Sequence, residues 1–525
     1  MTVVVALIAF LFGLCLIISL HELGHFMFAK KYNVLCYDYS IGMGPLIYGK
    51  KKGETTYGVR AIPLGGFVSM ADGSLAQDYL QKDVEIGINI NEENKITDII
   101  LCKDRERMIT GKVVERDIYC KEGNDPFITL NVDGVETKYE CLIDASIWYK
   151  PKKKIQLSPY NRCFESKTKW QRFVMLFAGP GMNFILAIFL FIIAGLLIGK
   201  QSNKPVIGSI EETFKLDKED IEAPAYHAGL RKGDKIIKIN DKAVEKWSDI
   251  DYLDTEIINN TTVTITYLRD EVEYTATVMP IITIGNLGVY GNFEKYSDVD
   301  GAVIYVYTTK ASQAGLEDKD IITKINDTEI HSWSDLIAFC QNEEIDGEKV
   351  KVTLTRDGKE KEIEVHLLGK RTVKSISDLE MLSARIGVSP KFHFDFFYSF
   401  VYSFKNFGSS IANVWNTLKL LFTSRDVGVK DLSGPVGIYA MIKNSLTGGF
   451  TNYIWFLGFL SVNIGIVNLL PIPALDGGRI LFVGIEAVTR KKVSRKVEDT
   501  LTTIVFFLLI GLLLYITFND ILRIF

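Results

Sequence analysis

The stretch His21-Glu22-Leu23-Gly24-His25 directly follows twenty residues, Met1 to Leu20, that carry no charge and are almost all apolar. Twenty apolar residues are long enough to cross the hydrocarbon core of a bilayer as a helix. Two histidines and a glutamate at the end of such a helix are energetically costly, which indicates a functional site. No basic residue precedes the run and no small-residue cleavage site ends it, so we expect a membrane span and not a signal peptide.

Three further segments are apolar enough to span a membrane. With the first, the expected spans are about 2–29, 173–199, 453–483 and 501–518. Lysines and arginines cluster after the first span, before the second, and between the third and the fourth. The positive-inside rule places these clusters in the cytoplasm. Both termini and the long region between the second and third spans are therefore expected outside.

An internal repeat occupies this outside region. Its first copy has Ala228-Gly229-Leu230, Ile239-Asn240-Asp241 and Trp247-Ser248-Asp249, and its second has Ala314-Gly315-Leu316, Ile325-Asn326-Asp327 and Trp333-Ser334-Asp335. The offset is 86 at each position (314 − 228, 326 − 240, 333 − 247), which indicates two copies of one small domain. Each copy resembles a PDZ domain, which binds an extended peptide at a sheet edge. Two spacer domains without a ligand are the alternative.

The remaining features exclude some functions. The net charge of −4, with both signs mixed, gives no reason to expect nucleic acid as a partner. None of the seven cysteines forms a C-x-x-C pair, which argues against a cysteine zinc site. The insert 71–165 is polar and has strand-like segments separated by turn residues, so we expect it to be β-rich and cytoplasmic, without catalytic residues.

The opening motif has the spacing of a metal site. On a helix, residues four apart share a face, so His21 and His25 can reach one ion. H-E-x-x-H on a helix is the signature of a zinc protease, in which the glutamate contacts the metal-bound water. Such a site needs a third protein ligand, and the position six residues past His25 is Lys31 instead of a histidine.

Glu54, 29 residues after His25 (54 − 25), is a poor candidate for the third ligand because it follows a basic turn. Asp476 is a better one. It lies in an otherwise apolar span that Pro471, Pro473 and two glycines interrupt. Broken helices are tolerated at membrane depth only where they line a protein-enclosed or wet cavity. The alternative role of Asp476 is to cap the second half of the broken helix.

Four motifs together resemble the site-2 protease family of intramembrane zinc metalloproteases, also called peptidase family M50. They are His21-Glu22-Leu23-Gly24-His25, Ala178-Gly179-Pro180-Gly181-Met182-Asn183, Ser433-Gly434-Pro435-Val436-Gly437, and the run from Asn468 to Gly478, which reads N-L-L-P-I-P-A-L-D-G-G. The two PDZ-like copies point to the bacterial RseP/RasP-type branch. The resemblance covers nearly the whole chain, except that the insert is longer than is usual.

The resemblance implies a role for each matched residue. His21, His25 and Asp476 are expected to bind Zn²⁺, and Glu22 to act as the general base. Asn468 is expected to hold the substrate backbone near the metal, with Pro471 and Pro473 beside it; helix capping is the alternative role of Asn468. The segment 57–68 resembles the family's membrane-dipping hairpin, whose Gly65-Gly66 end could pair with an extended substrate, or else form a plain surface hairpin.

The predicted fold is therefore a multi-pass α-helical membrane protein with about four transmembrane helices. It adds a membrane-associated β-hairpin, two extracytoplasmic PDZ-like domains of mixed α/β structure, and the cytoplasmic β-rich insert. The expected boundaries are 1–35 (first helix), 36–70 (hairpin), 71–165 (insert), 166–200 (second helix), 201–283 and 284–370 (PDZ-like domains), 371–451 (linker with an amphipathic interfacial segment), 452–490 (third helix) and 497–525 (fourth helix).

The predicted function is regulated intramembrane proteolysis in the bacterial inner or plasma membrane. The resemblance implies single-span membrane substrates, such as anti-sigma factors and remnant signal peptides, and a protease that trims the substrate first. The lysines after the opening motif place the zinc near the cytoplasmic face. Two alternatives from other classes are a non-proteolytic PDZ scaffold in the membrane and a zinc transporter that uses the same ligands.

Overall fold

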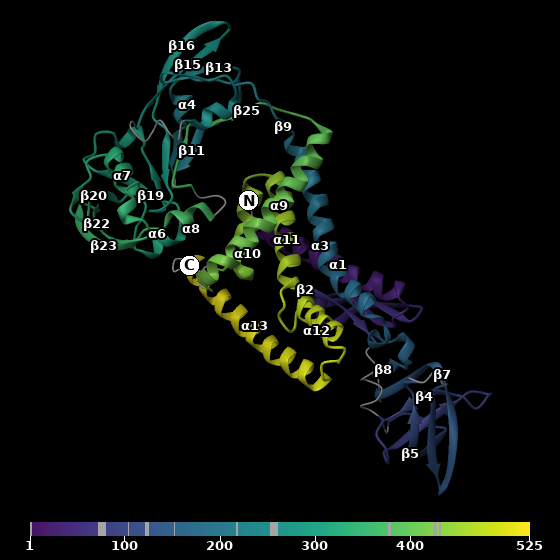
Figure 1. Cartoon of the computed structure of the whole chain (residues 1–525). Coiled ribbons are helices and arrows are strands. Elements are labelled where there is room, and N and C mark those ends of the chain that lie inside the picture. Colours follow the sequence, from purple (N-terminus) through teal and green to yellow (C-terminus); the bar gives the residue numbers. More distant parts are fainter. Residues whose placement is uncertain are drawn as a thin grey trace. The chain divides into compact units, whose positions relative to one another are not determined.

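The computed structural model describes residues 3–71, 80–102, 104–120, 125–151, 153–216, 219–252, 261–375, 380–423, 428–429 and 432–524. The chain forms two compact units, which are described separately (Figure 1). The first unit comprises Met1–Leu190 and Pro435–Tyr515, and the second comprises Phe191–Gly434 and Ile516–Phe525.

Among the described residues, four helices are long and apolar enough to cross a membrane. They are α1 (Val3–Lys31), α3 (Lys169–Ile198), α11 (Phe450–Leu469) and α13 (Arg495–Ile524, of which Lys496–Leu522 is the candidate span). This number agrees with the four spans expected from the sequence. The third span is shorter than expected, because α11 ends at Leu469 and a separate helix, α12 (Asp476–Thr489), begins after a break.

The helical core of the first unit joins segments from both ends of the sequence. Ile17 of α1, Leu186 of α3 and Leu457 of α11 pack in one buried cluster with Ile442 of α10 (Pro435–Thr447). The hydroxyl of Tyr453 donates to the carbonyl of Ala9 at 2.8 Å, which ties α11 to α1. The helix α10 lies in a stretch for which the sequence predicted only a linker and an interfacial segment.

Two long strands, β1 (Cys36–Lys52) and β2 (Thr55–Met70), form more than a simple hairpin. The segment 38–41 pairs on one side with 56–59 and on the other with 66–69, while 46–52 pairs with 55–60. The strands bend, and the spatial order becomes 46–52, 55–60, 38–41, 66–70. Among the described residues, 66–70 is therefore an edge segment of this sheet.

The insert is β-rich, as expected. Its strands follow the order β4-β3-β5-β6-β7-β8, and β4 also pairs in parallel with β7, which closes β4, β3, β5, β6 and β7 into a ring. Isoleucines of β3 and β4 and Leu130 of β6 fill its core. The strands are β3 (Glu85–Ile90), β4 (Ile96–Ile100), β5 (Ile109–Asp117), β6 (Phe127–Val132), β7 (Val135–Lys150) and β8 (Lys153–Gln156), followed by the 3-10 turns η1 (Tyr160–Arg162) and η2 (Phe164–Ser166).

The sequence repeat in the second unit corresponds to a structural repeat. The strands β14-β13-β15-β16 of the first copy have the same order as β21-β20-β22-β23 of the second. The first copy contains β13 (Lys235–Ile239), β14 (Lys242–Ala243), η3 (Trp247–Tyr252), β15 (Val263–Arg269) and β16 (Val272–Val278). The second contains β20 (Ile321–Ile325), β21 (Thr328–Glu329), α7 (Trp333–Cys340), η5 (Glu343–Ile345), β22 (Lys349–Arg356) and β23 (Lys359–His366).

Each copy holds its Gly-Leu turn with one ion pair whose carboxylate is buried. In the first, the Arg269 guanidinium donates from two nitrogens to Asp234 at 2.8 Å each, and to the carbonyl of Gly229 at 2.7 Å. In the second, Arg356 makes the same three contacts with Asp320 and the carbonyl of Gly315, each at 2.7 Å. Both carboxylates are almost fully buried, so each needs its cation.

The remaining elements of the second unit flank the two copies. Its long helix is α9 (Phe396–Thr423), which lies in the stretch for which the sequence predicted an amphipathic element. The others are β9 (Lys200–Gln201), β10 (Ile207–Ile210), β11 (Thr213–Leu216), β12 (Glu219–Glu222), α4 (Pro224–His227), β17 (Ile281–Ile284), β18 (Val289–Gly291), η4 (Glu294–Tyr296), β19 (Ala302–Val306), α6 (Thr309–Gln313), α8 (Lys370–Ser375), β24 (Leu382–Arg385), β25 (Val388–Pro390) and β26 (Phe392–His393).

Candidate active site

Three potential metal ligands from opposite ends of the chain meet in the first unit. His21 and His25 lie on α1, and Asp476 is the first residue of α12. The Nε2 atoms of the two histidines are 3.2 Å apart, and Oδ2 of Asp476 lies 3.1 Å from the first and 3.3 Å from the second. The histidines are only 8% and 6% exposed. Among the described residues, this is the one group of three or more His, Cys, Asp or Glu side chains close enough to share an ion.

The spacing of these three atoms fits zinc. Zinc binds histidine nitrogen and carboxylate oxygen at about 2.0–2.1 Å in a tetrahedron, so ligand atoms stand about 3.3 Å apart. The observed distances of 3.1, 3.2 and 3.3 Å match the edges of such a tetrahedron. Oδ2 of Asp476 is buried and, apart from the two imidazole nitrogens, meets no hydrogen-bond donor among the described residues, as expected of an atom whose partner is an ion. Three protein ligands leave a fourth position for water or substrate.

Helix α3 holds the other side of both imidazole rings. Nδ1 of His25 donates to the carbonyl oxygen of Met175 at 2.8 Å. Nδ1 of His21 lies 3.2 Å from the side-chain amide of Asn183, which is fully buried. Metal-binding histidines generally use their second nitrogen in this way, which fixes the ring orientation.

The two helices can approach this closely because both carry glycine at the crossing. A Cβ on Gly179 of α3 would lie 2.3 Å from Nε2 of His25 and 2.9 Å from Cε1 of His21. A Cβ on Gly24 of α1 would lie 2.2 Å from the carbonyl oxygen of Ala178. Both distances are too short for any side chain, so the crossing requires glycine on both helices.

The break before α12 fixes the position of Asp476. The chain turns back after α11, with Ala474 in the left-handed region at φ 81°. A Cβ on Gly477 would lie 2.2 Å from the carbonyl oxygen of Leu470, and one on Gly478 would lie 2.3 Å from that of Ile472. The first turn of α12 therefore packs backbone to backbone against the break.

Glu22 lies between the histidines and the edge of the β1–β2 sheet. Its carboxylate accepts a hydrogen bond from the backbone of Val68. A Cβ on Gly66 would lie 3.2 Å from Cγ of Glu22. The structure thus brings Gly66 next to Glu22, whereas Gly65, at φ 94°, faces the side chain of Met43. The edge segment 66–70 runs past the glutamate of the motif.

The other three predicted site residues surround the helix break. Asn468 lies one residue before the end of α11, and its half-buried side chain makes no hydrogen bond within the described part of the chain. Pro471 is exposed and Pro473 is half-buried, both between α11 and α12. These residues adjoin Asp476 in sequence, but none of them supplies a fourth ligand.

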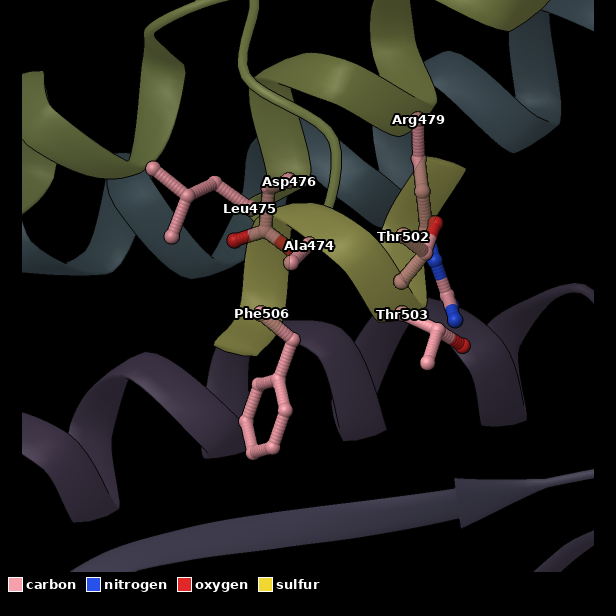
Figure 2. Close-up of a pocket in the computed structure, with 7 residues that line it drawn as sticks. All are labelled: Ala474, Leu475, Asp476, Arg479, Thr502, Thr503 and Phe506. Atoms are coloured by element: carbon pink, nitrogen blue, oxygen red, sulfur yellow. The ribbon is translucent and has the colours of Figure 1, made fainter. Parts of the chain in front are cut away.

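A cavity of about 290 Å³ opens beside Asp476 (Figure 2). Its lining comes from the break and α12 on one side and from α13 on the other: Ala474, Leu475, Asp476, Arg479, Thr502, Thr503 and Phe506. Arg479, one turn after Asp476, makes no ion pair or side-chain hydrogen bond with any residue that the structure describes. The cavity has room for polar groups next to the metal ligand.

Met175, Gly179 and Asn183 were not predicted as site residues. The sequence analysis quoted 178–183 only as a motif. A usable signal was present, because these three residues are spaced by four, as are His21 and His25. Residues spaced by four form one face of a helix, and this face of α3 receives both histidines.

Two buried histidines and a partly buried carboxylate, with a glutamate beside them and with the histidines on a helix long enough to span a bilayer, form a cluster that could hold a metal ion. The comparison with protein families agrees: residues 9–512 match the model of Peptidase family M50. The chain belongs to this family.

The relatives cover the whole length of the chain. The zinc metalloprotease RasP of Oceanobacillus iheyensis is 28% identical over all of both chains. The RasP of Bacillus licheniformis, also a zinc metalloprotease, is 29% identical over 99% of each chain. The regulator of sigma-W protease RasP of Bacillus subtilis is 28% identical over 99% of this chain and 98% of its own.

Among solved structures, the HtrA-type protease AlgW with a decapeptide aligns with 58% of this chain and 67% of its own, at 12% identity. Its TM-score of 0.12 is too low to support a conclusion about the fold.

The family and its relatives identify the class of enzyme. The chain is a zinc-dependent metalloendopeptidase of the site-2 protease type and a bacterial membrane protein. The predictions of family, enzyme class and cofactor are therefore confirmed. The PDZ assignment, the orientation in the membrane, the substrates and the roles of individual residues go further than this and are taken up below.

Proposed function

We propose that this protease cleaves peptide bonds within or near the transmembrane segments of single-span membrane proteins. Anti-sigma factors and remnant signal peptides are the substrate classes that we infer. The observation that carries the proposal is the His21, His25 and Asp476 cluster, with Glu22 beside it, at the end of a helix that can span a bilayer. A buried hydrolytic site at that depth suits substrates that are themselves in the membrane.

We assign the zinc ligands to His21, His25 and Asp476. When bound, zinc supplies Lewis acidity, which polarises a carbonyl and lowers the pKa of water to about 7. The hydrogen bond from His25 to Met175 and the contact of His21 with Asn183 hold the two rings so that both Nε2 atoms face Asp476. The ligands are thus oriented in advance by the protein.

Glu22 acts as the general base and then the general acid. It follows His21 directly, so its side chain lies about 100° further round α1 than the metal-facing side. The carboxylate takes a proton from the attacking water and passes it to the nitrogen of the leaving amine. The backbone contact with Val68 keeps the carboxylate at the edge segment 66–70 while it does so.

The edge segment 66–70 and the break before α12 would hold the substrate in an extended form. A transmembrane helix hides each carbonyl in its own hydrogen-bond ladder, so the substrate must unwind before cleavage. An edge strand offers unpaired backbone groups to an extended chain. Asn468, whose side-chain amide has no partner among the described residues, can bind the substrate backbone, and Pro471 and Pro473 keep the neighbouring backbone extended.

The two repeat copies are proposed to be PDZ-like domains on the outer side of the membrane. Their equivalent strand order and equivalent Arg-Asp pairs support two copies of one domain. On that side they would exclude substrates that still carry a large outer domain, so that cleavage follows trimming by another protease. The basic clusters favour a cytoplasmic insert and an active site near the cytoplasmic face.

The experiment that tests this function is Glu22→Gln in the full chain, in membranes, with a tagged single-span substrate. We expect zinc content to be retained and cleavage to fall by at least about 100-fold, the low end for loss of general acid-base catalysis. Glu136→Gln, at the exposed start of β7 in the insert, is the control and should cleave normally. Undiminished cleavage by Glu22→Gln would contradict the mechanism and favour a scaffold or a transporter, neither of which needs the base.

A further inference from the structure

One face of α3 serves both zinc-binding histidines. Three of its residues lie at successive turns. The carbonyl of Met175 contacts His25, the backbone of Gly179 lies against both imidazole rings, and the side chain of Asn183 contacts His21. The contact with Met175 uses a main-chain carbonyl, which can only accept, so His25 donates from Nδ1 and has its Nε2 lone pair free for a metal. The contact with Asn183 has no such fixed direction.

The side-chain amide of Asn183 can face His21 with its nitrogen or its oxygen. With the nitrogen towards His21, Nδ1 of the ring accepts and Nε2 carries the hydrogen, so that Nε2 cannot bind a metal. That arrangement also leaves Oδ1 of Asn183 buried without a hydrogen-bond partner. With the oxygen towards His21, Nδ1 of the ring donates to Oδ1 and the Nε2 lone pair is free for a metal, while the amide nitrogen takes the buried position that Oδ1 leaves. A half-turn of the amide interchanges the two.

We propose that Asn183 is a positioning residue for zinc: its Oδ1 accepts from Nδ1 of His21 and so holds the ring in the metal-binding tautomer. This inference rests on the proposed zinc ligands. It assigns a role to Asn183, which lies in the motif 178–183 but had no role in the sequence analysis. An outer partner that accepts from a metal-binding histidine is a general requirement of such sites. Asn183 then does for His21 what the Met175 carbonyl does for His25.

The backbone and the side chain of Asn183 have different partners. Ser461 of α11 donates from its hydroxyl to the carbonyl oxygen of Asn183 at 2.8 Å. Both residues are fully buried, at 0% exposure. Ser461 therefore ties α11 to α3 at the level of the site without contacting the amide. Substitution of Ser461 therefore tests the packing of the helices, and substitution of Asn183 tests the orientation of the His21 ring.

The test measures zinc affinity, not activity, in the detergent-purified full chain. Three variants are compared by competition with a chelator: Asn183→Leu, which keeps the size but removes the oxygen; Asn183→Asp, which presents only oxygens; and Ser461→Ala, the packing control. Loss of an outer-shell partner typically weakens metal binding 10–100-fold. We expect about that loss of zinc affinity for Asn183→Leu. The zinc affinity of Ser461→Ala should stay within about threefold of wild type. Asn183→Asp should also bind zinc within about threefold of wild type, or more tightly. Absorption of the Co²⁺-substituted protein should change only in Asn183→Leu.

The outcomes separate this inference from the proposed function. Wild-type zinc affinity in Asn183→Leu would overturn the inference, as would an equal loss in Asn183→Asp or in Ser461→Ala. If Asn183→Leu fails to accumulate, Asn183→Asp decides alone: retained affinity supports an oxygen facing His21, and lost affinity overturns it. His21→Ala tests the ligand assignment independently, because wild-type affinity in that variant would contradict the proposed zinc site itself.

Discussion

Nε2 of His25 lies 3.3 Å from Oδ2 of Asp476, although the two residues belong to helices near opposite ends of the chain. No local interaction brings them together; the packing of α1, α10 and α11 and the break before α12 do. Within the described part of the chain, Oδ2 of this carboxylate contacts the two imidazoles and has no other hydrogen-bond donor. Its negative charge close to two imidazoles is best explained by an ion among the three.

Asp476→Asn tests that charge directly. The change keeps the size of the side chain but removes the negative charge, so we expect zinc affinity to fall by more than the 10–100-fold typical of outer-shell changes. Metal content after dialysis against a chelator is the measurement. Asp499→Asn is a suitable control, since Asp499 is an exposed carboxylate at the start of α13. Equal zinc retention in the two variants would show that Asp476 is not a ligand.

Gly179→Ala should disable the site without changing any polar group. The added Cβ would stand 2.3 Å from Nε2 of His25, so the ring or the helix must move by about 1 Å. Displacement of that size costs about 100-fold in rate at an active site. Gly181→Ala is the matched control, because among the described residues its Cβ would meet the Phe177 ring alone, at 3.5 Å. Initial rates on a single-span substrate distinguish them, and similar rates would mean that the crossing of α1 and α3 is looser than described.

The ion pair between Glu54 and Arg162 should make stability depend on pH. The two side chains form a bidentate pair, and the hydrogen bonds from Arg162 lower the pKa of Glu54. A lowered folded-state pKa contributes stability above the unfolded-state value of about 4.3, and that contribution is lost as the pH falls through the folded-state value.

We therefore expect Glu54→Gln to melt at a lower temperature than wild type at pH 7. The difference should narrow below about pH 4.3 and vanish once Glu54 is protonated in the folded chain. Glu93→Gln is the control, because the Glu93 side chain is 73% exposed and its contact with Lys95 is weak, at 4.0 Å. A difference in melting temperature that stays constant down to acid pH would rule out this ion pair as its source.

Arg269→Met should destabilise the first repeat copy strongly. It leaves the Asp234 carboxylate, which is 1% exposed, without its cation. Removing one partner of a fully buried pair costs about 3–5 kcal/mol, and the 35% exposure of the Arg269 side chain places the cost at the lower end of that range. Arg385→Met, which breaks the exposed pair with Glu211, should cost less than about 1 kcal/mol. Limited proteolysis of the full chain, followed at residues 201–283, reports the difference. Equal protease resistance in the two variants would contradict a structural role for the buried pair.

The sequence predicted the helices and the polar residues of the site better than it predicted their surroundings. Long apolar runs at α1, α3 and α13 can hardly be anything but membrane helices. Asp476 stood out because a carboxylate in an apolar span is costly. The Met175 carbonyl has no signature in the sequence, since any residue would supply it. Asn183 lay in a quoted motif, but only the geometry connects it with His21.

The sheet beside Glu22 shows a second limit of sequence analysis. Alternation along 57–68 predicted a hairpin, yet segment 38–41 pairs on both sides. Pairing of this kind depends on where a strand bends, and bending is decided by contacts with α1 and by glycines whose partners lie far away in sequence. The helix α10 was also missed, because its sequence is only moderately apolar and it is stabilised by packing on α1.

The close backbone packing of Gly477 and Gly478 has a genetic consequence. Neither glycine donates an atom to the metal cluster, yet any side chain at either position would collide with a carbonyl of the preceding turn. A saturation screen for loss of function should therefore find these two positions as intolerant of substitution as Asp476. Neither a polar nor a charged replacement should restore activity there, because the collision depends on size alone. Judged by mutational sensitivity, the active site of this enzyme extends beyond the residues that perform its chemistry.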